Sequence, residues 1–300
     1  MWLAVENPRS VSQCVSVQSV KIVLVDFHTH TRASDGVLTP GELLERAAAR
    51  GVRLLAITDH DTVAGYLAAR ELSGGTPAAP RLVAGVEFSC RWSGATVHII
   101  GLGIDCEHPA MAEGLGILTA ARTRRGVRIG EKLADRGFAG ALEGALAEAG
   151  DSQLGRPHFA AWMIRCGHVP DARTAFKRFL GRGRPGDVMA FWPELGQVVD
   201  WIESSGGAAV VAHPVKYGFS GNKLRRLLAD FAAAGGSGIE VACGHQTPEQ
   251  THRLRRYARE FDLEISVGSD FHRDAPYAPA LGVDLPRADG LRGVWERWVA

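Results

Sequence analysis

Histidine and carboxylate residues recur in short motifs along this chain, and their spacing is typical of metal ligands. His28 and His30 are separated by one residue, and Asp270 and His272 repeat that spacing near the other end of the sequence. Residues two apart in an extended strand point to the same side, so each pair can face one ion. Imidazole and carboxylate together suit Mn²⁺, Fe²⁺ or Zn²⁺, whereas a soft thiolate site would need nearby cysteines. The pairs predict a site for divalent cations.

Further candidate ligands stand where short apolar runs of the sequence end, at His60, Glu87 and His213. Any one of them has an ordinary structural explanation, because a histidine beside a strand is more often a hydrogen-bonded core residue, and Glu87 alone fits a buried ion pair. Burying all of these ionisable groups together would cost several kcal/mol each without compensating charge. Metal cations supply that charge, and a carboxylate such as Glu87 can bridge two ions. The combination favours a metal centre over a purely structural role.

The elements that must position these residues alternate between strands and helices. The helix after the first strand has a capping box of Thr39 and Glu42, Pro40 at its first position, and Gly51 beyond its end. We expect strands at residues 22–25, 54–58, 82–88, 96–104, 208–212, 239–242 and 264–267, and further helices at 62–72, 193–204, 222–234 and 248–261. This alternation predicts an α/β protein with a parallel sheet, doubly wound or closed as a barrel. Strand ends are where such folds gather functional groups.

The middle of the chain differs from both ends. Residues 105–188 show helical patterning without a convincing strand, and they hold 13 basic against 10 acidic residues. The simplest interpretation is a mildly basic helical insertion in the α/β body. The predicted division is a loose N-terminal extension at 1–20, a first barrel part at 21–104, the insertion at 105–190, and a second barrel part at 191–300.

Composition limits the classes of function. The chain has 300 residues, a net charge of +1 and 46% hydrophobic residues, and no run of about 20 apolar residues that a membrane helix needs. This argues against a membrane protein and against broad coating of nucleic acid, although binding of a short strand stays open. Residues 1–19 lack the basic leader and apolar core of a signal peptide. Five cysteines without a CxxC pair predict a reduced, cytoplasmic protein.

The motifs resemble those of the PHP family, the polymerase and histidinol phosphatase phosphoesterases, from about Lys21 to Trp298. They are DFHTHTRASDG, ITDHDT, GVEFS, VHIIGLG, VVAHP and GSDFH. Within the family the chain is most similar to the bacterial branch that hydrolyses nucleoside 3′,5′-bisphosphates and trims short 5′-phosphorylated RNA. The segments GRPHFA at residues 155–160, AFKRFLGRGRP at 175–185 and the closing VWERW carry this closer resemblance.

The resemblance implies a distorted (β/α)₇ PHP barrel, a helical insertion that caps the substrate, and three divalent ions per chain. Mn²⁺ is favoured, with Fe²⁺, Zn²⁺ or Mg²⁺ as alternatives. It assigns nine residues as metal ligands and catalytic residues: His28, His30, Glu87 and Asp270 for one ion, Glu87 again with His98 and His213 for a second, and Asp35, His60 and His272 for the third. All nine positions hold residues that can bind a metal.

The resemblance also gives the insertion a role in substrate binding. Arg156 and His158 would contact a substrate phosphate, with Arg182 and Arg184 as further candidates, because guanidinium grips phosphate oxygens bidentately. A solvated surface position explains Arg182 and Arg184 equally well. The arginines at 122, 124, 125 and 128 are expected on an exposed helix face. Asp187 departs from the family pattern, since many relatives carry an aromatic residue there.

The predicted activity is phosphoester hydrolysis by a water that the cations activate, removing the 3′-phosphate of nucleoside 3′,5′-bisphosphates, trimming short 5′-phosphorylated RNA in the 5′ to 3′ direction, or both. The expected partners are a nucleotide or short RNA, with no membrane and no obligate protein partner. Alternatives are a histidinol-phosphate-type small-molecule phosphatase, a non-catalytic metal-binding PHP module, and a proofreading module acting in trans. The basic insertion counts against the first and the complete ligand set against the second, while a chain without a polymerase domain disfavours the third.

Overall fold

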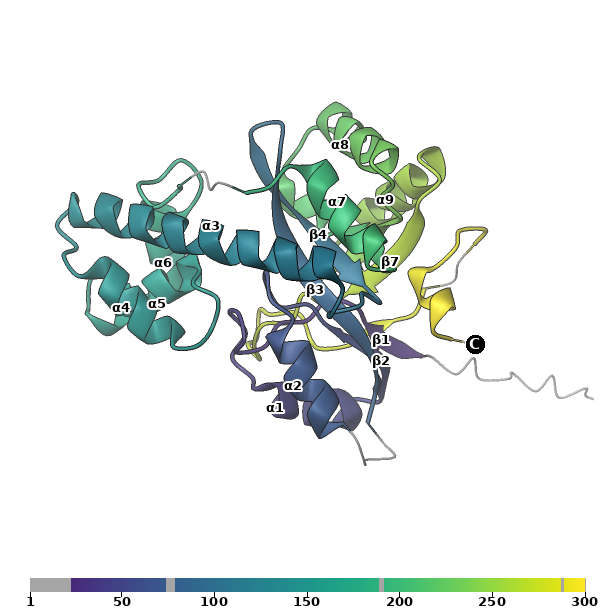
Figure 1. The fold of residues 1–300 in the computed structure, drawn as a ribbon, viewed down its shortest axis with the longest axis horizontal. Helices are drawn as coiled ribbons and strands as arrows, with labels where there is room; N and C mark the ends of the chain where they lie inside the picture. Colours follow the sequence, from purple (N-terminus) through teal and green to yellow (C-terminus); the bar gives the residue numbers. More distant parts are fainter. Residues whose placement is uncertain (1–22, 74–78, 189–191, 287–288, 300) are drawn as a thin grey trace, which may run out of the picture.

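The computed structural model describes residues 23–73, 79–188, 192–286 and 289–299. Eight strands form one sheet in the order β7-β6-β5-β4-β3-β2-β1-β8 (Figure 1). The strands are β1 (Leu24–Asp26), β2 (Val52–Ile57), β3 (Arg81–Trp92), β4 (Ala95–Leu102), β5 (Ala208–Val211), β6 (Gly238–Cys243), β7 (Glu264–Gly268) and β8 (Val283–Asp284). The extension predicted at residues 1–20 lies outside the described residues.

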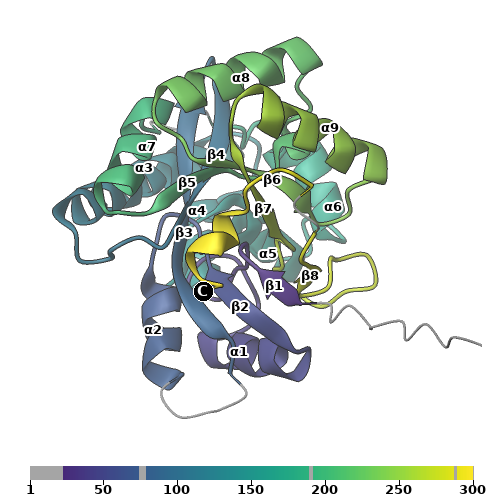
Figure 2. The same ribbon diagram turned by 90° about the vertical axis from the view of Figure 1, so that its right-hand side faces the viewer.

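The sheet curls until its first and seventh strands meet, as Figure 2 shows. The Phe27 amide donates to the Val267 carbonyl over 3.2 Å, and Thr29 pairs with Phe271 in parallel. The sheet is therefore nearly closed and resembles a barrel, as the sequence predicted. Its closure brings the residues after β1 beside those after β7.

The expected parallel pairing holds within two blocks of strands and is wrong for β4. Strands β1, β2 and β3 pair in parallel, as do β5, β6 and β7. Strand β4 runs antiparallel to both β3 and β5, and the short β8 runs antiparallel to β1. The cause is local: Ser93 and Gly94, with φ of 45° and 70°, form a two-residue turn that reverses the chain into a hairpin.

Helices flank the sheet, and most begin close to the predicted positions. The capping box of α1 is present, with the Thr39 side chain accepting from the Glu42 amide and the Glu42 side chain accepting from the Thr39 amide. The α-helices are α1 (Pro40–Ala49), α2 (Ala64–Leu72), α3 (Pro109–Ala134), α4 (Ala141–Ala149), α5 (Arg156–Arg165), α6 (Ala172–Ala175), α7 (Leu195–Ser204), α8 (Gly221–Ala233) and α9 (Pro248–Glu260). Shorter turns are η1 (Phe176–Leu180), η2 (Pro214–Tyr217) and η3 (Val294–Arg297). In the described part of the chain, no helix combines the length and the apolar character that crossing a membrane requires.

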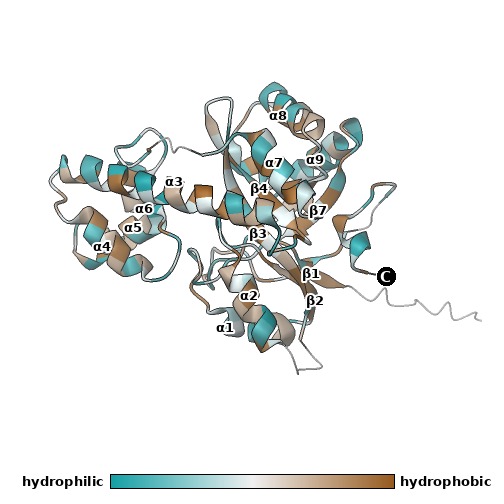
Figure 3. Cartoon of the chain, viewed as in Figure 1, coloured by the Kyte–Doolittle hydropathy of each residue, from teal (hydrophilic) through white to brown (hydrophobic). Residues whose placement is uncertain are grey.

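Helix α3 links the barrel to a second hydrophobic cluster (Figures 1 and 3). Its first half packs on α7, where a Cβ added at Gly114 would lie 2.6 Å from the Trp201 ring. Its second half contributes Ile129 and Leu133 to a separate cluster that includes Phe159. The cluster lies within the range predicted as an insertion, and α3 joins it to the barrel, as does a hydrogen bond from the Gln153 amide to the Ala33 carbonyl over 3.1 Å.

Candidate metal centre

The two histidines after β1 point to the same pair of carboxylates. The Nε2 atoms of His28 and His30 lie 3.4 and 3.3 Å from Glu87 Oε2. The same two atoms lie 3.4 and 3.3 Å from Oδ1 of Asp270, a residue that follows β7. All four side chains are buried. The predicted same-side geometry of His28 and His30 is therefore present, and barrel closure supplies the two acids.

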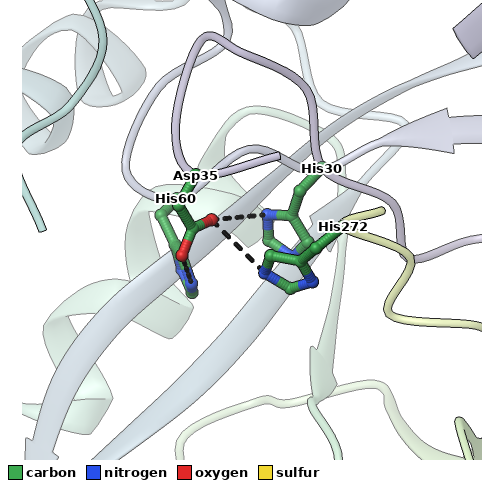
Figure 4. Close-up of side chains that lie close together, drawn as sticks. All are labelled: His30, Asp35, His60 and His272. Carbon is green, nitrogen blue, oxygen red and sulfur yellow. Dashed lines mark ion pairs between the residues drawn. The ribbon is translucent and has the colours of Figure 1, made fainter. Parts of the chain in front are cut away.

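A second group of four residues adjoins the first (Figure 4). Asp35 Oδ1 lies 3.8 Å from His30 Nδ1 and 3.3 Å from His272 Nε2, while its Oδ2 lies 4.0 Å from His60 Nε2. Ligand atoms of these four side chains all lie within 4.8 Å of one another. This separation allows the four to share one ion.

Glu87 stands at the centre of the whole cluster. Its Oε1 lies 2.9 Å from His98 Nδ1 and 2.8 Å from His213 Nε2, and its Oε2 lies 2.9 Å from His60 Nδ1. The structure thus brings all nine predicted ligands together around one carboxylate. They come from segments spread between residues 28 and 272, and the curled sheet brings these segments together.

Several polar atoms in this cluster have no hydrogen-bond partner among the described residues. They are His28 Nε2, His30 Nε2, His60 Nδ1, His213 Nδ1 and Glu87 Oε2. Buried polar atoms without partners are rare because each costs the desolvation energy of that group. Nitrogen and oxygen atoms that converge in this way are the ligands that divalent cations take. The residues present therefore fit divalent metal ions.

The pKa shifts of two groups, Glu87 and His30, suit metal binding, whereas at His28, His60 and His272 burial is outweighed by neighbouring carboxylates, which raise the pKa of each imidazole. Burial alone would raise the pKa of Glu87, but the imidazoles of His60 and His98 outweigh it and hold that pKa well below its usual range. Burial, together with the neighbouring His272, lowers the pKa of His30 to about 3. The carboxylate is thus ionised and the His30 imidazole neutral, which are the forms that bind metals.

Two buried carboxylates hold the ligands in place without belonging to the predicted set. Glu240 on β6 contacts two of the candidate ligands. Its Oε1 lies 2.9 Å from His28 Nδ1, and its Oε2 accepts a hydrogen bond of 2.5 Å from the His213 amide. Asp59 accepts from the Thr31 amide at 2.7 Å and from Ser34 Oγ at 2.6 Å, which fixes the loop that carries Asp35. Such partners set the orientation and basicity of metal ligands. One sequence signal was available for Glu240: an acidic residue within an otherwise apolar strand.

Lys216 is a further residue of the site that sequence analysis missed. It follows His213 in η2, and its ammonium contacts Asp270 Oδ2. The Lys216 side chain remains 52% exposed, so it can also reach a bound anion. No pattern in the sequence distinguished this lysine from an ordinary surface lysine.

A cavity of about 420 Å³ adjoins the metal-ligand cluster. Asp35, His60 and His98 line it on the barrel side, and Arg156 and Arg182 line it from residues 105–190. Of the four predicted phosphate contacts, His158 and Arg184 do not line this cavity. The His158 Nδ1 instead accepts the Gly155 amide over 3.0 Å at the start of α5.

Two arginines of α3 also reach the cavity, which corrects a prediction. Arg122 and Arg125 were expected on an exposed helix face but are 7% and 9% exposed. Arg122 Nε donates to Asp61 Oδ2 over 2.6 Å, and both guanidinium groups lie within 6 Å of the Trp192 ring, at 5.5 and 5.7 Å. Position on the helix explains this, because the two share a face with buried Leu118. The other two arginines, at 124 and 128, are exposed as expected.

Asp187 makes two polar contacts within residues 105–190. Asp187 accepts the Gly183 amide over 2.7 Å, and its Oδ1 lies 3.9 Å from Arg156 Nη1. It therefore stabilises the loop before it and stands beside a predicted phosphate contact.

Comparison with known proteins agrees with the motifs. Residues 26–127 match the family model of the PHP domain. Over 277 residues the chain is 42% identical to a 5'-3' exoribonuclease of Haemophilus influenzae, covering 91% of this chain and 98% of that protein. The chain belongs to the PHP domain family. This PHP protein is also 43% identical over 276 residues to a 3',5'-nucleoside bisphosphate phosphatase of Chromobacterium violaceum, covering 90% of this chain and 95% of the relative.

Solved structures of related chains share the fold of this PHP protein. A structure from Chromobacterium violaceum, described as an amidohydrolase with bound sulfate and no metal, matches with a TM-score of 0.83 and 40% identity over 91% of this chain and 95% of that one. A candidate metal-dependent phosphoesterase from Bifidobacterium adolescentis matches with a TM-score of 0.76 and 30% identity, covering 88% and 93% of the two chains. The family and barrel-like fold predicted from the motifs are confirmed.

Proposed function

We propose that this PHP protein hydrolyses the bond between a ribose 3′-oxygen and phosphorus, both in nucleoside 3′,5′-bisphosphates and at the 5′ end of 5′-phosphorylated RNA. The proposal is carried by the nine-residue cluster around Glu87, which opens into an arginine-lined cavity. The two substrates named by its relatives share this bond. Its hydrolysis releases inorganic phosphate from the bisphosphate, and from RNA it releases a nucleotide and leaves a 5′-phosphate on the shortened strand. One site can therefore serve both.

The cluster would hold divalent cations, with three ions and Mn²⁺ as the expected loading. The ligand sets remain those expected from the resemblance: His28, His30, Glu87 and Asp270; Glu87, His98 and His213; Asp35, His60 and His272. When bound, the cations supply positive charge that activates a water and offsets charge on the phosphate in the transition state. Glu240 fixes the orientation of the His28 ring, and Lys216 stands where its ammonium can meet a phosphate oxygen.

The arginines of residues 105–190 would bind the terminal 5′-phosphate. Burial, together with the neighbouring Arg156 and Arg122, lowers the pKa of Arg125 to about 9. An anion placed among these guanidinium groups relieves their repulsion, and their planar donors match phosphate oxygens. Arg156 and Arg182 are the best placed of the predicted contacts because they line the cavity. The helical segment then acts as a cap over the nucleotide.

The test offers the Mn²⁺-loaded protein three substrates in parallel: adenosine 3′,5′-bisphosphate, a 5′-phosphorylated RNA oligomer and histidinol phosphate. We expect phosphate release from the first, stepwise shortening of the second from its 5′ end, and no turnover of the third. Exclusive cleavage of histidinol phosphate would contradict the proposal, and so would an absence of turnover with all three.

A matched pair of variants tests the phosphate contact. Arg156→Ala should raise KM for adenosine 3′,5′-bisphosphate and change KM for adenosine 3′-monophosphate much less, because the second substrate lacks the 5′-phosphate. Arg128→Ala is the control, since Arg128 is exposed on α3 and pairs with Glu131 outside the cavity. Equal effects of Arg156→Ala on both substrates would reject the assignment.

A further inference from the structure

We propose that Phe219 forms a stacking surface for the base that follows the scissile phosphate, so that RNA gains a binding subsite that a nucleoside bisphosphate cannot use. The inference rests on the proposed function and deepens it, because it specifies how the same centre would distinguish an oligoribonucleotide from a mononucleotide. Phe219 lies between η2 and α8 and lines the cavity beside the metal-ligand cluster.

The Phe219 ring is partly exposed and lies beside two other aromatic rings. Its centroid lies 5.4 Å from that of Tyr217 and 5.9 Å from that of Trp92. The Tyr217 hydroxyl in turn accepts the backbone amide of His98 over 2.9 Å. Phe219 therefore packs on Tyr217, and Tyr217 is hydrogen-bonded to β4, the strand that carries His98. A partly exposed aromatic ring that lines the cavity beside the reacting centre is what a stacking position requires.

Positive charge accompanies this ring. The Lys223 ammonium lies 4.4 Å from the Phe219 ring centroid and 5.8 Å from that of Trp92. Lys216, half exposed, lines the same cavity. Aromatic rings combined with cations are the features by which proteins bind single-stranded nucleic acid, because bases stack on the rings and the cations meet the backbone. A purely apolar ligand would gain nothing from the two ammonium groups.

The arrangement of charges determines which end of the strand lies on this surface. The guanidinium groups of Arg125, Arg156 and Arg182 suit a terminal phosphate, which carries more charge than an internal one. A 5′-nucleotide bound there places its 3′-phosphate at the metal-ligand cluster. The rest of the strand would then leave the metal-ligand cluster along the barrel side of the cavity, and Phe219 lines the cavity from the barrel segment between η2 and α8, whereas the arginines come from residues 105–190. The ring therefore faces the nucleotide on the 3′ side.

The experiment compares adenosine 3′,5′-bisphosphate with a 5′-phosphorylated adenosine dinucleotide, using the full-length Mn²⁺-loaded protein. Phe219→Ala should lower kcat/KM for the dinucleotide by at least about fivefold, the weak end of the range for one stacked base, while kcat/KM for the bisphosphate stays within about twofold. Phe219→Trp should retain the dinucleotide activity because it keeps an aromatic face. Tyr66→Ala is the matched control: its ring is also partly buried beneath a cation, with Arg70 at 5.9 Å, but it does not line the cavity.

Each outcome decides between the two proposals. If wild-type protein cleaves both substrates and Phe219→Ala leaves their ratio unchanged, the stacking subsite is rejected and the proposed function stands. Equal loss on both substrates, or failure of Phe219→Trp to retain dinucleotide activity, also rejects the subsite. If wild-type protein cleaves neither substrate, the proposed function fails and the subsite fails with it.

Discussion

Removal of the Arg122 guanidinium should destabilise the protein strongly, because it would leave the Asp61 carboxylate buried without its counter-charge. Arg122 Nε donates to Asp61 Oδ2 over 2.6 Å, and the two side chains are 8% and 0% exposed. Asp61 would keep the Ser89 amide and hydroxyl, at 2.6 and 3.0 Å, but would have no ion pair among the described residues, and Arg125 would act on it only at longer range. Breaking one partner of a buried ion pair typically costs about 3–5 kcal/mol, so we expect Arg122→Met to lower the free energy of unfolding by about that amount.

The assay is urea unfolding of the Mn²⁺-loaded protein, with Asp61→Asn and the double variant completing a double-mutant cycle. The double variant should lose less stability than the sum of the two single variants, because neither charge is then buried alone. Arg128→Met is the control: its pair with Glu131 is 60% and 51% exposed, so it should change stability by less than about 1 kcal/mol. A loss for Arg122→Met as small as that of the control, or additive single effects, would refute the reasoning.

Three further predictions concern the metal centre and the helical segment beside it. Glu240→Gln should weaken Mn²⁺ affinity about 10- to 100-fold, measured by calorimetry, because the His28 ring loses its carboxylate partner; an unchanged affinity would show that the contact has no influence on the metal. Saturating Mn²⁺ should raise the midpoint of thermal unfolding, with about 2.7 kcal/mol of stabilisation at 100 times Kd, and a midpoint independent of Mn²⁺ would speak against a site in the folded state. Gly144→Ala should cost about 1–3 kcal/mol in urea unfolding, since its Cβ would lie 2.0 Å from Trp162 Cδ1, whereas Gly116→Ala, with open space around it, should cost none of this.

The clustering of the candidate metal ligands could be predicted from the sequence because their chemistry is visible in short motifs. His28 and His30 stand one residue apart after a strand, and Asp270 and His272 repeat the pattern. Charged and imidazole side chains are seldom buried without partners, so their recurrence at strand ends indicated a shared site. The sequence could not give their mutual distances, which depend on closure of β1 against β7.

The antiparallel orientation of β4 could not be predicted from the pattern of apolar runs in the sequence. Alternating hydrophobic runs look alike in parallel and antiparallel pairs, and only the Ser93-Gly94 turn determines that β3 and β4 form a hairpin. That dipeptide between two apolar runs was the available signal. Because β4 carries His98, its direction also determines how this ligand reaches Glu87.

The burial of two arginines on α3 could not be predicted from the sequence because arginine is usually exposed. An arginine-rich helix usually faces water, yet Arg122 and Arg125 share a face with buried Leu118 and Ile129. The spacing of these four residues follows the helical repeat, so the pattern was present and was outweighed by the charge of the residues. Their buried partners, such as Asp61, come from a segment about 60 residues away, which no local pattern reveals.

The most direct test of the account measures metal content and phosphatase activity on the same samples. The protein is demetallated with a chelator, and then reloaded with Mn²⁺ in steps while bound metal is counted by mass spectrometry and phosphate release from adenosine 3′,5′-bisphosphate is followed. We predict negligible turnover by the metal-free protein and activity that rises with bound Mn²⁺. For a Glu87→Ala variant we predict negligible turnover both without and with added Mn²⁺. Full-speed phosphate release by the metal-free protein, or wild-type activity in Glu87→Ala, would contradict the account.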